Sequence, residues 1–446
     1  MTKCERKTSV VRVLVAAATS MMVGLAGCAS SGQRATGGAS DIAPVNVIFL
    51  HPDGSGINMW AATRMLYAGP DGDLAWDGLP HLGIYRGHLR DALAASSNAG
   101  GTIHAYGVKV GQDKSFGNDN GVPLGRESIA REALRRGKAV GIVSSATVAD
   151  AGTGTFLADA PDRKKYTLIA QQMLEARPQV LLGGGEQFFL PKGVRGRHGE
   201  GMREDGRDLI REAREAGYHV VFTRDELLAT PANVTKLLGL FAANDTFLDM
   251  PEEEQREKGT PDYVTTAPTY AEMVQAALRV LEREEEGFLL VAEEEGTDNF
   301  AGKNNARGAM VACRRADDGI AVARAFVARR PDTFLMVAAD SDCGGMQVVS
   351  EFDMDPSKPL PARDDENGAP LDGATGTGTL PFLAAADARG RRLPFGIAWA
   401  AGGDVAGAVV VRGDGARADE LIRPTMDNTA IYRAMRAAVF GEEVTE

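Results

Sequence analysis

The chain has 446 residues, of which 44% are hydrophobic, so it can bury a large core in one or two domains. Its 53 glycines and 20 prolines are scattered, a distribution typical of turns in an α/β protein and unlike a low-complexity segment. The formal net charge of −12 argues against a nucleic-acid partner, because phosphate backbones bind basic surfaces. A small anionic substrate is not excluded, since one arginine in a metal-bearing cleft outweighs the average field.

Residues 1–27 have the pattern of a targeting signal. Basic residues precede a short apolar stretch, Val13 to Val23, which is too short for a transmembrane helix. The stretch ends in Leu25-Ala26-Gly27-Cys28, which resembles a bacterial lipoprotein box; the alternative is an ordinary secretory signal with an incidental cysteine. Residues 28–44 are rich in Ser, Gly and Ala and predict a flexible tether. We therefore expect an extracytoplasmic lipoprotein that is anchored to a membrane by lipid on Cys28.

From residue 45 to residue 441, short apolar runs alternate with amphipathic helical segments. This alternation predicts one α/β domain with a central, mostly parallel sheet and helices on both faces. Residues 353–379 are rich in Pro, Gly and Asp and lack periodicity, which predicts a lid or a surface-loop insertion. The predicted strands are 45–50, 139–143, 180–182, 220–222, 288–291, 334–338, 395–398 and 408–411, and the main predicted helices are 126–136, 208–216, 269–285, 314–329 and 428–440.

Four of the predicted strands are followed by acidic residues. Ligands of such sheets bind outside the carboxyl ends of the strands, so these side chains are expected along one rim. A cluster of carboxylates repels itself unless cations neutralise it, and two or more divalent metals would do so. For any single residue, a helix cap or a turn is the alternative. The strand-end acids are Asp53, Asp150, Glu293, Glu294, Glu295, Asp298, Asp340 and Asp342.

A separate stretch, Ser96 to Lys109, supplies hydroxyl groups. It begins with small residues, so another group can approach its backbone closely. A serine at a helix N-terminus lies where backbone N–H groups and the helix dipole favour an anion. Ser96-Ser97-Asn98 is equally a typical helix cap, so this stretch alone does not identify a nucleophile.

The order of these segments resembles the alkaline phosphatase family. The matching segments include "NVIFLHPDGSG", "SSNAGGTIHAYGVKV", "VLLGGGEQFFLP", "LLGLFAANDTF", "FLLVAEEEGTDN", "LMVAADSD", "WAAGGDVAG" and "MDNTAIYRAM", and they run in family order from Asn46 to Met435. The resemblance implies the alkaline-phosphatase-like fold. It also implies a metal-dependent phosphoric monoester hydrolase that acts on a small phosphorylated substrate through a phosphoserine intermediate.

The resemblance also implies roles for individual residues. Ser97 matches the serine that becomes phosphorylated, and Ser96 stands where the family usually has an aspartate. Arg163 matches the arginine that clamps phosphate. Asn98, His104 and Lys303 are candidates for substrate contact or charge compensation. The implied metal ligands are Asp53, Asp150, Thr153 or the neighbouring Gly152, Glu294 or Glu295, Asp298 or Asn299, and Asp340.

The chain departs from the family at its zinc-binding histidines. The three matching positions hold Ser341, Lys303 and Ala400. The remaining oxygen ligands favour Mg²⁺, Mn²⁺ or Ca²⁺, whereas the resemblance itself implies Zn²⁺. Because side chains alternate along an extended chain, Asp340 and Asp342 are expected to face one cation, with a turn cap as the alternative for Asp342.

Two function classes remain open at this stage. Retention of Ser97, Arg163 and the acidic residues favours a hydrolase. Loss of the three histidines favours a lipoprotein of the same fold that binds phosphate or metal without turnover. After Cys28 only Cys313 and Cys343 remain, and a disulfide between them is compatible with an oxidising compartment.

Overall fold

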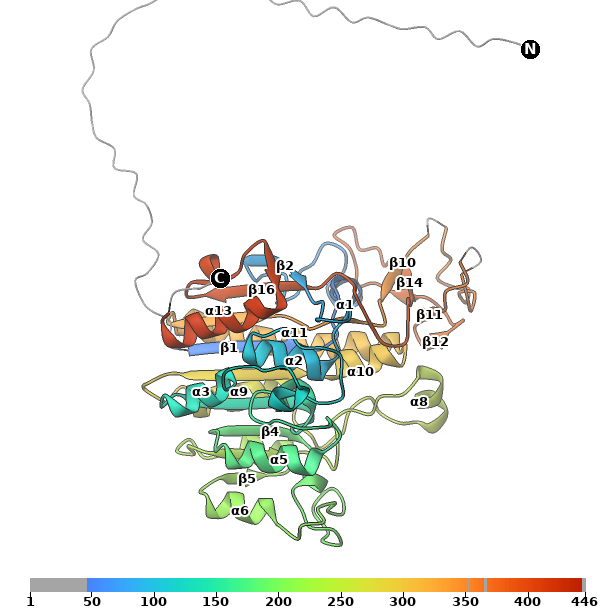
Figure 1. Ribbon diagram of the computed structural model, residues 1–446. Helices are drawn as coiled ribbons and strands as arrows, with labels where there is room; N and C mark the ends of the chain where they lie inside the picture. The colour runs from blue at the N-terminus through green and yellow to red at the C-terminus, as the bar shows by residue number, and fades with distance from the viewer. Residues whose placement is uncertain (1–45, 352, 365–366, 443–446) are drawn as a thin grey trace, which may run out of the picture. The chain divides into compact units, whose positions relative to one another are not determined.

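The computed structural model describes residues 46–351, 353–364 and 367–442, all of which belong to one folded unit. Its centre is a ten-stranded sheet with the order β17-β2-β16-β8-β1-β7-β3-β4-β6-β5 (Figure 1). The strands from β8 to β5 in that order run parallel, and β16 runs antiparallel to β8 and β2. The strands are β1 Asn46–Pro52, β2 His81–Arg86, β3 Ala139–Thr147, β4 Val180–Gly184, β5 His219–Val221, β6 Leu237–Leu240, β7 Phe288–Glu294, β8 Thr333–Val337, β16 Val410–Gly415 and β17 Thr425–Asp427.

Helices cover both faces of this sheet. In β1, Val47 and Phe49 pack into one hydrophobic core, while Ile48 and Leu50 pack into another on the opposite side. We call these the α2 face, covered by α2, α3, α5, α6 and α13, and the α11 face, covered by α1, α7, α9, α10 and α11 (Figure 1). The predicted α/β class with a mostly parallel sheet is confirmed. The helices are α1 Ile57–Tyr67, α2 Ser97–Tyr106, α3 Ile129–Arg135, α4 Ala151–Gly154, α5 Tyr166–Glu175, α6 Leu209–Glu215, α7 Arg224–Leu228, α8 Glu252–Lys258, α9 Tyr270–Leu281, α10 Gly296–Gly302, α11 Ala306–Arg329, α12 Ala418–Leu421 and α13 Asn428–Phe440.

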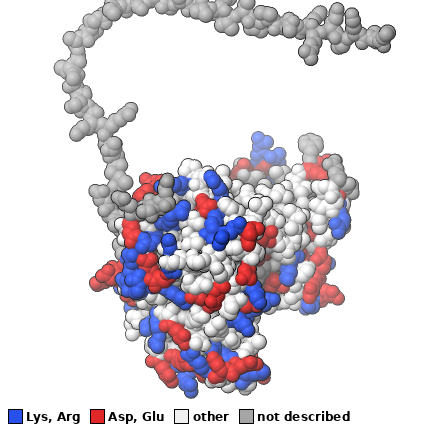
Figure 2. Space-filling model, viewed as in Figure 1, with Lys and Arg blue, Asp and Glu red and all other residues white. Residues whose placement is uncertain are grey.

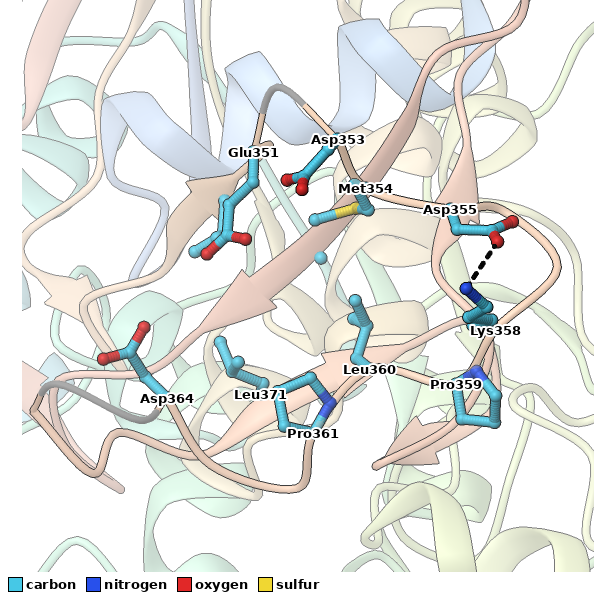
Figure 3. Close-up of a pocket in the computed structure, with 12 residues that line it drawn as sticks. Glu351, Asp353, Met354, Asp355, Lys358, Pro359, Leu360, Pro361, Asp364 and Leu371 are labelled. Carbon is cyan, nitrogen blue, oxygen red and sulfur yellow. Dashed lines mark ion pairs between the residues drawn. The ribbon is translucent and has the colours of Figure 1, made fainter.

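The chain between β8 and β16 forms two smaller sheets. The predicted lid or loop, 353–379, contributes β11 and β12 to the larger of these two sheets. Residues of this segment also line a cavity of about 570 Å³ (Figure 3). Asp355 and Lys358 form an ion pair on its wall, and its lining contains none of Asp53, Glu293, Glu295 and Asp340. The strands of this region are β9 Asp342–Cys343, β10 Gln347–Val349, β11 Leu371–Gly373, β12 Gly376–Thr377, β13 Phe382–Leu383, β14 Pro394–Ala398 and β15 Asp404–Val405.

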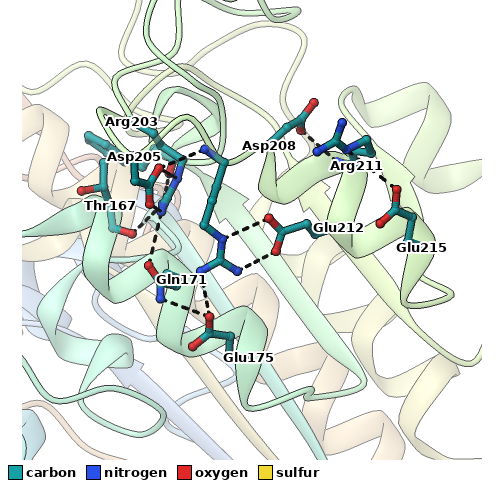
Figure 4. Close-up of polar contacts among 11 residues, drawn as sticks. Thr167, Gln171, Glu175, Arg203, Asp205, Asp208, Arg211, Glu212 and Glu215 are labelled. Atoms are coloured by element: carbon teal, nitrogen blue, oxygen red, sulfur yellow. Dashed lines mark hydrogen bonds and ion pairs between the residues drawn. The ribbon is translucent and has the colours of Figure 1, made fainter.

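A polar network ties α5 and α6 to the segment between them (Figure 4). The buried guanidinium of Arg203 donates to the carbonyl oxygens of Thr167 at 2.7 Å and Phe188 at 3.1 Å, and it pairs with Asp205. Because these donors are matched by acceptors, we assign the network to structural support.

Basic and acidic side chains are interspersed on the face of the molecule shown in Figure 2. None of the helices in the described ranges combines the length and the apolar character that a membrane span requires. The predicted signal (1–27), the tether (28–44) and the lipidated Cys28 lie outside the described residues.

Candidate metal and active site

Acidic residues from three neighbouring strands meet on the α2 face, where β1, β7 and β8 end. Asp53 lies with His51 and Asp340 in one group of potential ligands, and with Glu293 and Glu295 in a second. Within each group the ligand atoms lie within 4.8 Å of one another. Asp53 is therefore shared by two adjacent groups, a geometry that suits a bridging carboxylate.

The cluster has the chemistry of a cation site. Burial raises the pKa of Glu293, Glu295 and Asp340 well above the ordinary value, and the charge of Asp53 raises each of them further. Buried charges need a partner, and a divalent cation supplies one to several oxygens at once. The buried ligand atoms without a hydrogen-bond partner are Nε2 of His51, Oδ2 of Asp53, Oε1 of Glu293, Oε2 of Glu295 and both carboxylate oxygens of Asp340.

Glu294 points away from this cluster, so its assignment as a ligand is wrong by one residue. In β7, Leu289 and Val291 pack on the α2 face and Leu290 packs on the α11 face. Strand alternation then places Glu294 on the α11 face, where its Oε1 pairs with Arg315 at 2.9 Å. Its two neighbours, Glu293 and Glu295, are the residues that face Asp53.

Helix α4 approaches Glu293 through a glycine. A Cβ at Gly152 would overlap the Glu293 carboxylate, so the absence of a side chain makes room for it. Oε2 of Glu293 also accepts a hydrogen bond of 3.0 Å from Ser144. Thr153 is fully buried and its hydroxyl has no partner. The contact between α4 and the cluster thus involves Gly152, the alternative to Thr153 in the prediction.

Arg163 lies beside the same carboxylates. Its guanidinium is 3.3 Å from Oδ2 of Asp150, and its side chain is 27% exposed, so part of it remains free for an anion. Burial acts to lower the pKa of Arg163, but the charges of Asp150, Glu295 and Asp53 raise it above the ordinary value. The structure therefore brings Arg163 and Asp150 to the cluster, as the resemblance implies.

Helix α2, which begins with Ser97, lies against the cluster. Ser97 is 6% exposed. Gly100 lies on the same helix face, three residues further on, and a Cβ there would come within 2.5 Å of the Cβ of Asp340. Gly101 makes a similarly close approach to α4. The small residues after Ser97 thus allow the helix to lie directly against Asp340.

A third group of potential ligands lies next to the first two. It consists of Asp298 in α10, Cys343 in β9 and Asp404 in β15, again with ligand atoms within 4.8 Å of one another. Ser341 supports this group, since its hydroxyl donates to Oδ1 of Asp404 at 2.6 Å. Cys343 and Cys313 are both free, so the disulfide considered from the sequence is not formed.

Asp342 does not share a cation site with Asp340. Its carboxylate packs against Gly56 and Gly407, and burial alone raises its pKa to about 6. The prediction failed because the backbone bends at Asp340, between the end of β8 at Val337 and the start of β9 at Asp342. In β9 the neighbouring residue, Cys343, is the one that faces the third group.

Three further predicted residues serve other roles. The amide of Asn98 donates to the carbonyl oxygens of residues 113 and 115, which fixes the adjoining loop. His104 is buried, with Nε2 2.8 Å from the hydroxyl of Tyr85. Lys303 is exposed; burial raises the pKa of Asp249, and the charge of Lys303 counteracts that rise. None of the three provides a ligand atom to the groups described above.

A small cleft of about 220 Å³ opens beside the cluster and includes Asp340 and Ser341 in its lining. Its other walls come from the end of β2 and from residues 405–409. Asp340 is 1% exposed and its carboxylate oxygens are buried, so the cleft adjoins the cluster without exposing it.

Asp404 was not predicted from the sequence, Cys343 was considered only for a disulfide, and Glu293 was counted among the strand-end acids without being chosen as a ligand. His51 stands two residues before Asp53 on one strand, so alternation places both on one face. Glu293 and Glu295 share their face for the same reason. Nothing local in the sequence pairs Asp404 with Cys343, because they are brought together by the contact between β9 and β15.

Comparison with known proteins identifies the family of this chain. Residues 45–363 match the alkaline phosphatase family. An alkaline phosphatase of Gadus morhua is 29% identical over 290 residues, which cover 56% of this chain and 58% of that protein. A membrane-bound alkaline phosphatase of Bombyx mori is 28% identical over 339 residues, covering 66% of this chain and 60% of that protein. The match therefore spans about three fifths of these relatives.

Solved structures show the same fold over a larger part of the chain. The alkaline phosphatase of Thermus thermophilus superposes with a TM-score of 0.69 at 26% identity, covering 92% of this chain and 96% of that one. The enzyme of the Antarctic bacterium TAB5 gives a TM-score of 0.67 at 18% identity, covering 90% and 99%. With the family match extending over most of the folded unit, this chain belongs to the alkaline phosphatase family.

Proposed function

We propose that this chain is a metal-dependent phosphomonoester hydrolase that acts through a phosphoserine intermediate on Ser97. The observation that carries the proposal is the position of Ser97. Ser97 begins a ten-residue helix, and the next turn of that helix lies against Asp340. Asp340 belongs to the cluster of buried carboxylates whose oxygens lack hydrogen-bond partners. A nucleophilic hydroxyl, a helix N-terminus that attracts anions and a cation site are thereby combined.

Divalent cations in such a cluster would supply positive charge to the phosphoryl oxygens and lower the pKa of a nearby hydroxyl. Residues of the chain itself would bind the phosphoryl group and attack it. Arg163 donates to the phosphoryl oxygens, and the N–H groups at the start of α2 favour the same negative charge. The Ser97 oxygen attacks phosphorus as the bond to the leaving alkoxide breaks and the alcohol departs with a proton. Water then cleaves the Ser97–phosphorus bond, and phosphate leaves.

The ligand groups suggest more than one kind of cation. The group of Asp53, Glu293 and Glu295 offers only oxygen atoms, which suit Mg²⁺. Magnesium is bound in the M3 site of a variant of the TAB5 enzyme. The other two groups each include one nitrogen or sulfur ligand, so the expectation of an all-oxygen set holds for one group of the three. We therefore propose Mg²⁺ at Glu293 and Glu295.

Turnover of p-nitrophenyl phosphate by metal-free protein, with single cations and pairs of cations added back, tests the activity. A stoichiometric phosphate adduct on the Ser97 peptide, detected by mass spectrometry after acid quench, tests the intermediate. Protein that binds phosphate but shows no turnover with any cation would support the alternative, a binding lipoprotein of the same fold.

The proposal places the enzyme outside the cytoplasm, anchored through Cys28, and gives it a small phosphorylated substrate and no nucleic-acid partner. It rests on the signal-like composition of residues 1–27 and on the cleft of about 220 Å³. Labelling with a radioactive fatty acid, and its loss in Cys28→Ser, tests the anchor.

A further inference from the structure

His51 is held with one ring nitrogen directed at the acidic cluster. Its Nδ1 lies 2.7 Å from the carbonyl oxygen of Ala338, which can only accept a hydrogen bond, so Nδ1 carries the proton. The ring also packs between Phe49 and His104, with centroids 5.6 Å and 5.4 Å away. With 2% of the residue exposed, this orientation is fixed by its surroundings.

The other nitrogen, Nε2, faces carboxylates. It lies 3.2 Å from Oδ1 of Asp53, and its group also contains Asp340. In the neutral ring, Nε2 presents a lone pair to these carboxylates, which is repulsive unless a positive charge lies between them.

A proton and a metal ion would satisfy this site to different extents. A proton on Nε2 would make one hydrogen bond to Asp53 and leave both oxygens of Asp340 without a partner. A divalent cation accepts electron pairs from all three residues at once. Metal-bound histidines typically donate their other N–H to a backbone carbonyl, which is the contact that His51 makes with Ala338.

We propose that His51 is a metal ligand of this chain, with Nε2 completing a site formed by Asp53 and Asp340. The residue after Asp340, where the resemblance places a histidine, is Ser341, whose hydroxyl is engaged with Asp404. His51 reaches the same cation from β1, two residues before Asp53. The site has one imidazole and two carboxylates, which favours Zn²⁺ or Co²⁺ over Mg²⁺ or Ca²⁺. It therefore differs in preference from the neighbouring group that contains Glu293 and Glu295.

The inference rests on the metal dependence in the proposed function, but its test needs no substrate. Full-length protein is loaded with Zn²⁺ and dialysed, its metal content is measured, and zinc-edge X-ray absorption is recorded. We expect outer-shell scattering from imidazole in the wild-type protein. In His51→Gln we expect the loss of one bound zinc equivalent or an affinity at least 100-fold weaker, together with a smaller rise in melting temperature on adding zinc. His104→Gln, which changes a buried histidine in contact with His51, is the matched control and should retain the zinc.

Wild-type protein without imidazole scattering would overturn the proposal, and so would His51→Gln that keeps wild-type zinc content and affinity. If His51→Gln does not fold, the wild-type absorption spectrum decides alone. Zinc bound through imidazole in a protein without phosphatase activity would refute the proposed function and leave the ligand in place. Phosphatase activity in a zinc-loaded protein without imidazole scattering would support the proposed function and refute His51 as a ligand.

Discussion

The contact between α2 and Asp340 makes Gly100→Ala an informative substitution. A Cβ at position 100 would lie 2.5 Å from the Cβ of Asp340 and 2.6 Å from its Oδ2. Carbon atoms in contact are about 3.5–4.0 Å apart, so the two elements must separate by roughly 1 Å. The Cβ of Asp340 is fixed by its backbone and cannot rotate away. The helix must therefore move, and it carries Ser97 with it.

The expected cost falls on catalysis more than on stability. Replacing a helical glycine with alanine gains about 1 kcal/mol of helix propensity, while overpacking costs about 1–3 kcal/mol, so the net loss is at most about 2 kcal/mol. A displacement of 1 Å in a catalytic group costs about 100-fold in rate. We expect kcat/KM for p-nitrophenyl phosphate to fall by about 100-fold in a protein that remains folded.

The control is Gly302→Ala, at a helical glycine of α10 whose added Cβ would lie 3.6 Å from Sγ of Cys343, an ordinary contact. It should change kcat/KM little. If Gly100→Ala lowers the melting temperature but leaves kcat/KM unchanged, the contact between α2 and Asp340 does not position Ser97, and the reasoning fails.

Five further substitutions test other parts of the site. Ser97→Ala should reduce turnover by on the order of 1,000-fold or more with an unchanged melting temperature, while Ser96→Ala should not; near wild-type activity in Ser97→Ala would remove it as the nucleophile. Arg163→Ala should weaken inhibition by inorganic phosphate by roughly 1.5–3 kcal/mol, and an unchanged inhibition constant would exclude Arg163 from the phosphate site. Asp342→Asn should leave the metal content unchanged, whereas Asp340→Asn should lower it. Burial raises the pKa of Asp342 to about 6, so the folded protein retains this proton longer than the unfolded chain does, and stability should fall as pH rises from about 4 to 6. When unfolding by urea is measured across this pH range, the free energy of unfolding of Asp342→Asn should fall less than that of the wild-type protein, by up to about 3 kcal/mol. If both proteins lose the same free energy of unfolding, the raised pKa of Asp342 is refuted.

The sequence identified the parallel strands because both of their faces are buried. Such strands are continuous apolar runs, as in β1, β7 and β8, and all three were found within a few residues. The edge-proximal β2 was missed, because its residues alternate between exposed and partly or fully buried positions. The short β6, Leu237–Leu240, was also missed, since four residues with a glycine have little pattern.

The side on which each ligand lies was harder to predict than its location in the chain. Three consecutive glutamates must alternate, so Glu293 and Glu295 share one face, but the sequence does not say which face carries α2. The same rule failed for Asp340 and Asp342 because the backbone bends at Asp340, after β8 has ended. Ser341 and Cys343 still alternate as expected and both face Asp404. The sequence gives no sign of the bend at Asp340.

With His51 as a ligand, a bound cation would also connect different segments of the chain. A histidine at position 341 would be adjacent to Asp340, so both ligands would come from one segment after β8. His51 lies in β1 and Asp53 directly follows it, whereas Asp340 comes from the segment after β8. A cation bound there links two neighbouring parallel strands, and through Asp53 it is coupled to the carboxylates that follow β7. Because the unfolded chain has no such arrangement, the binding free energy adds to the stability of this rim, on which α2 and Ser97 depend.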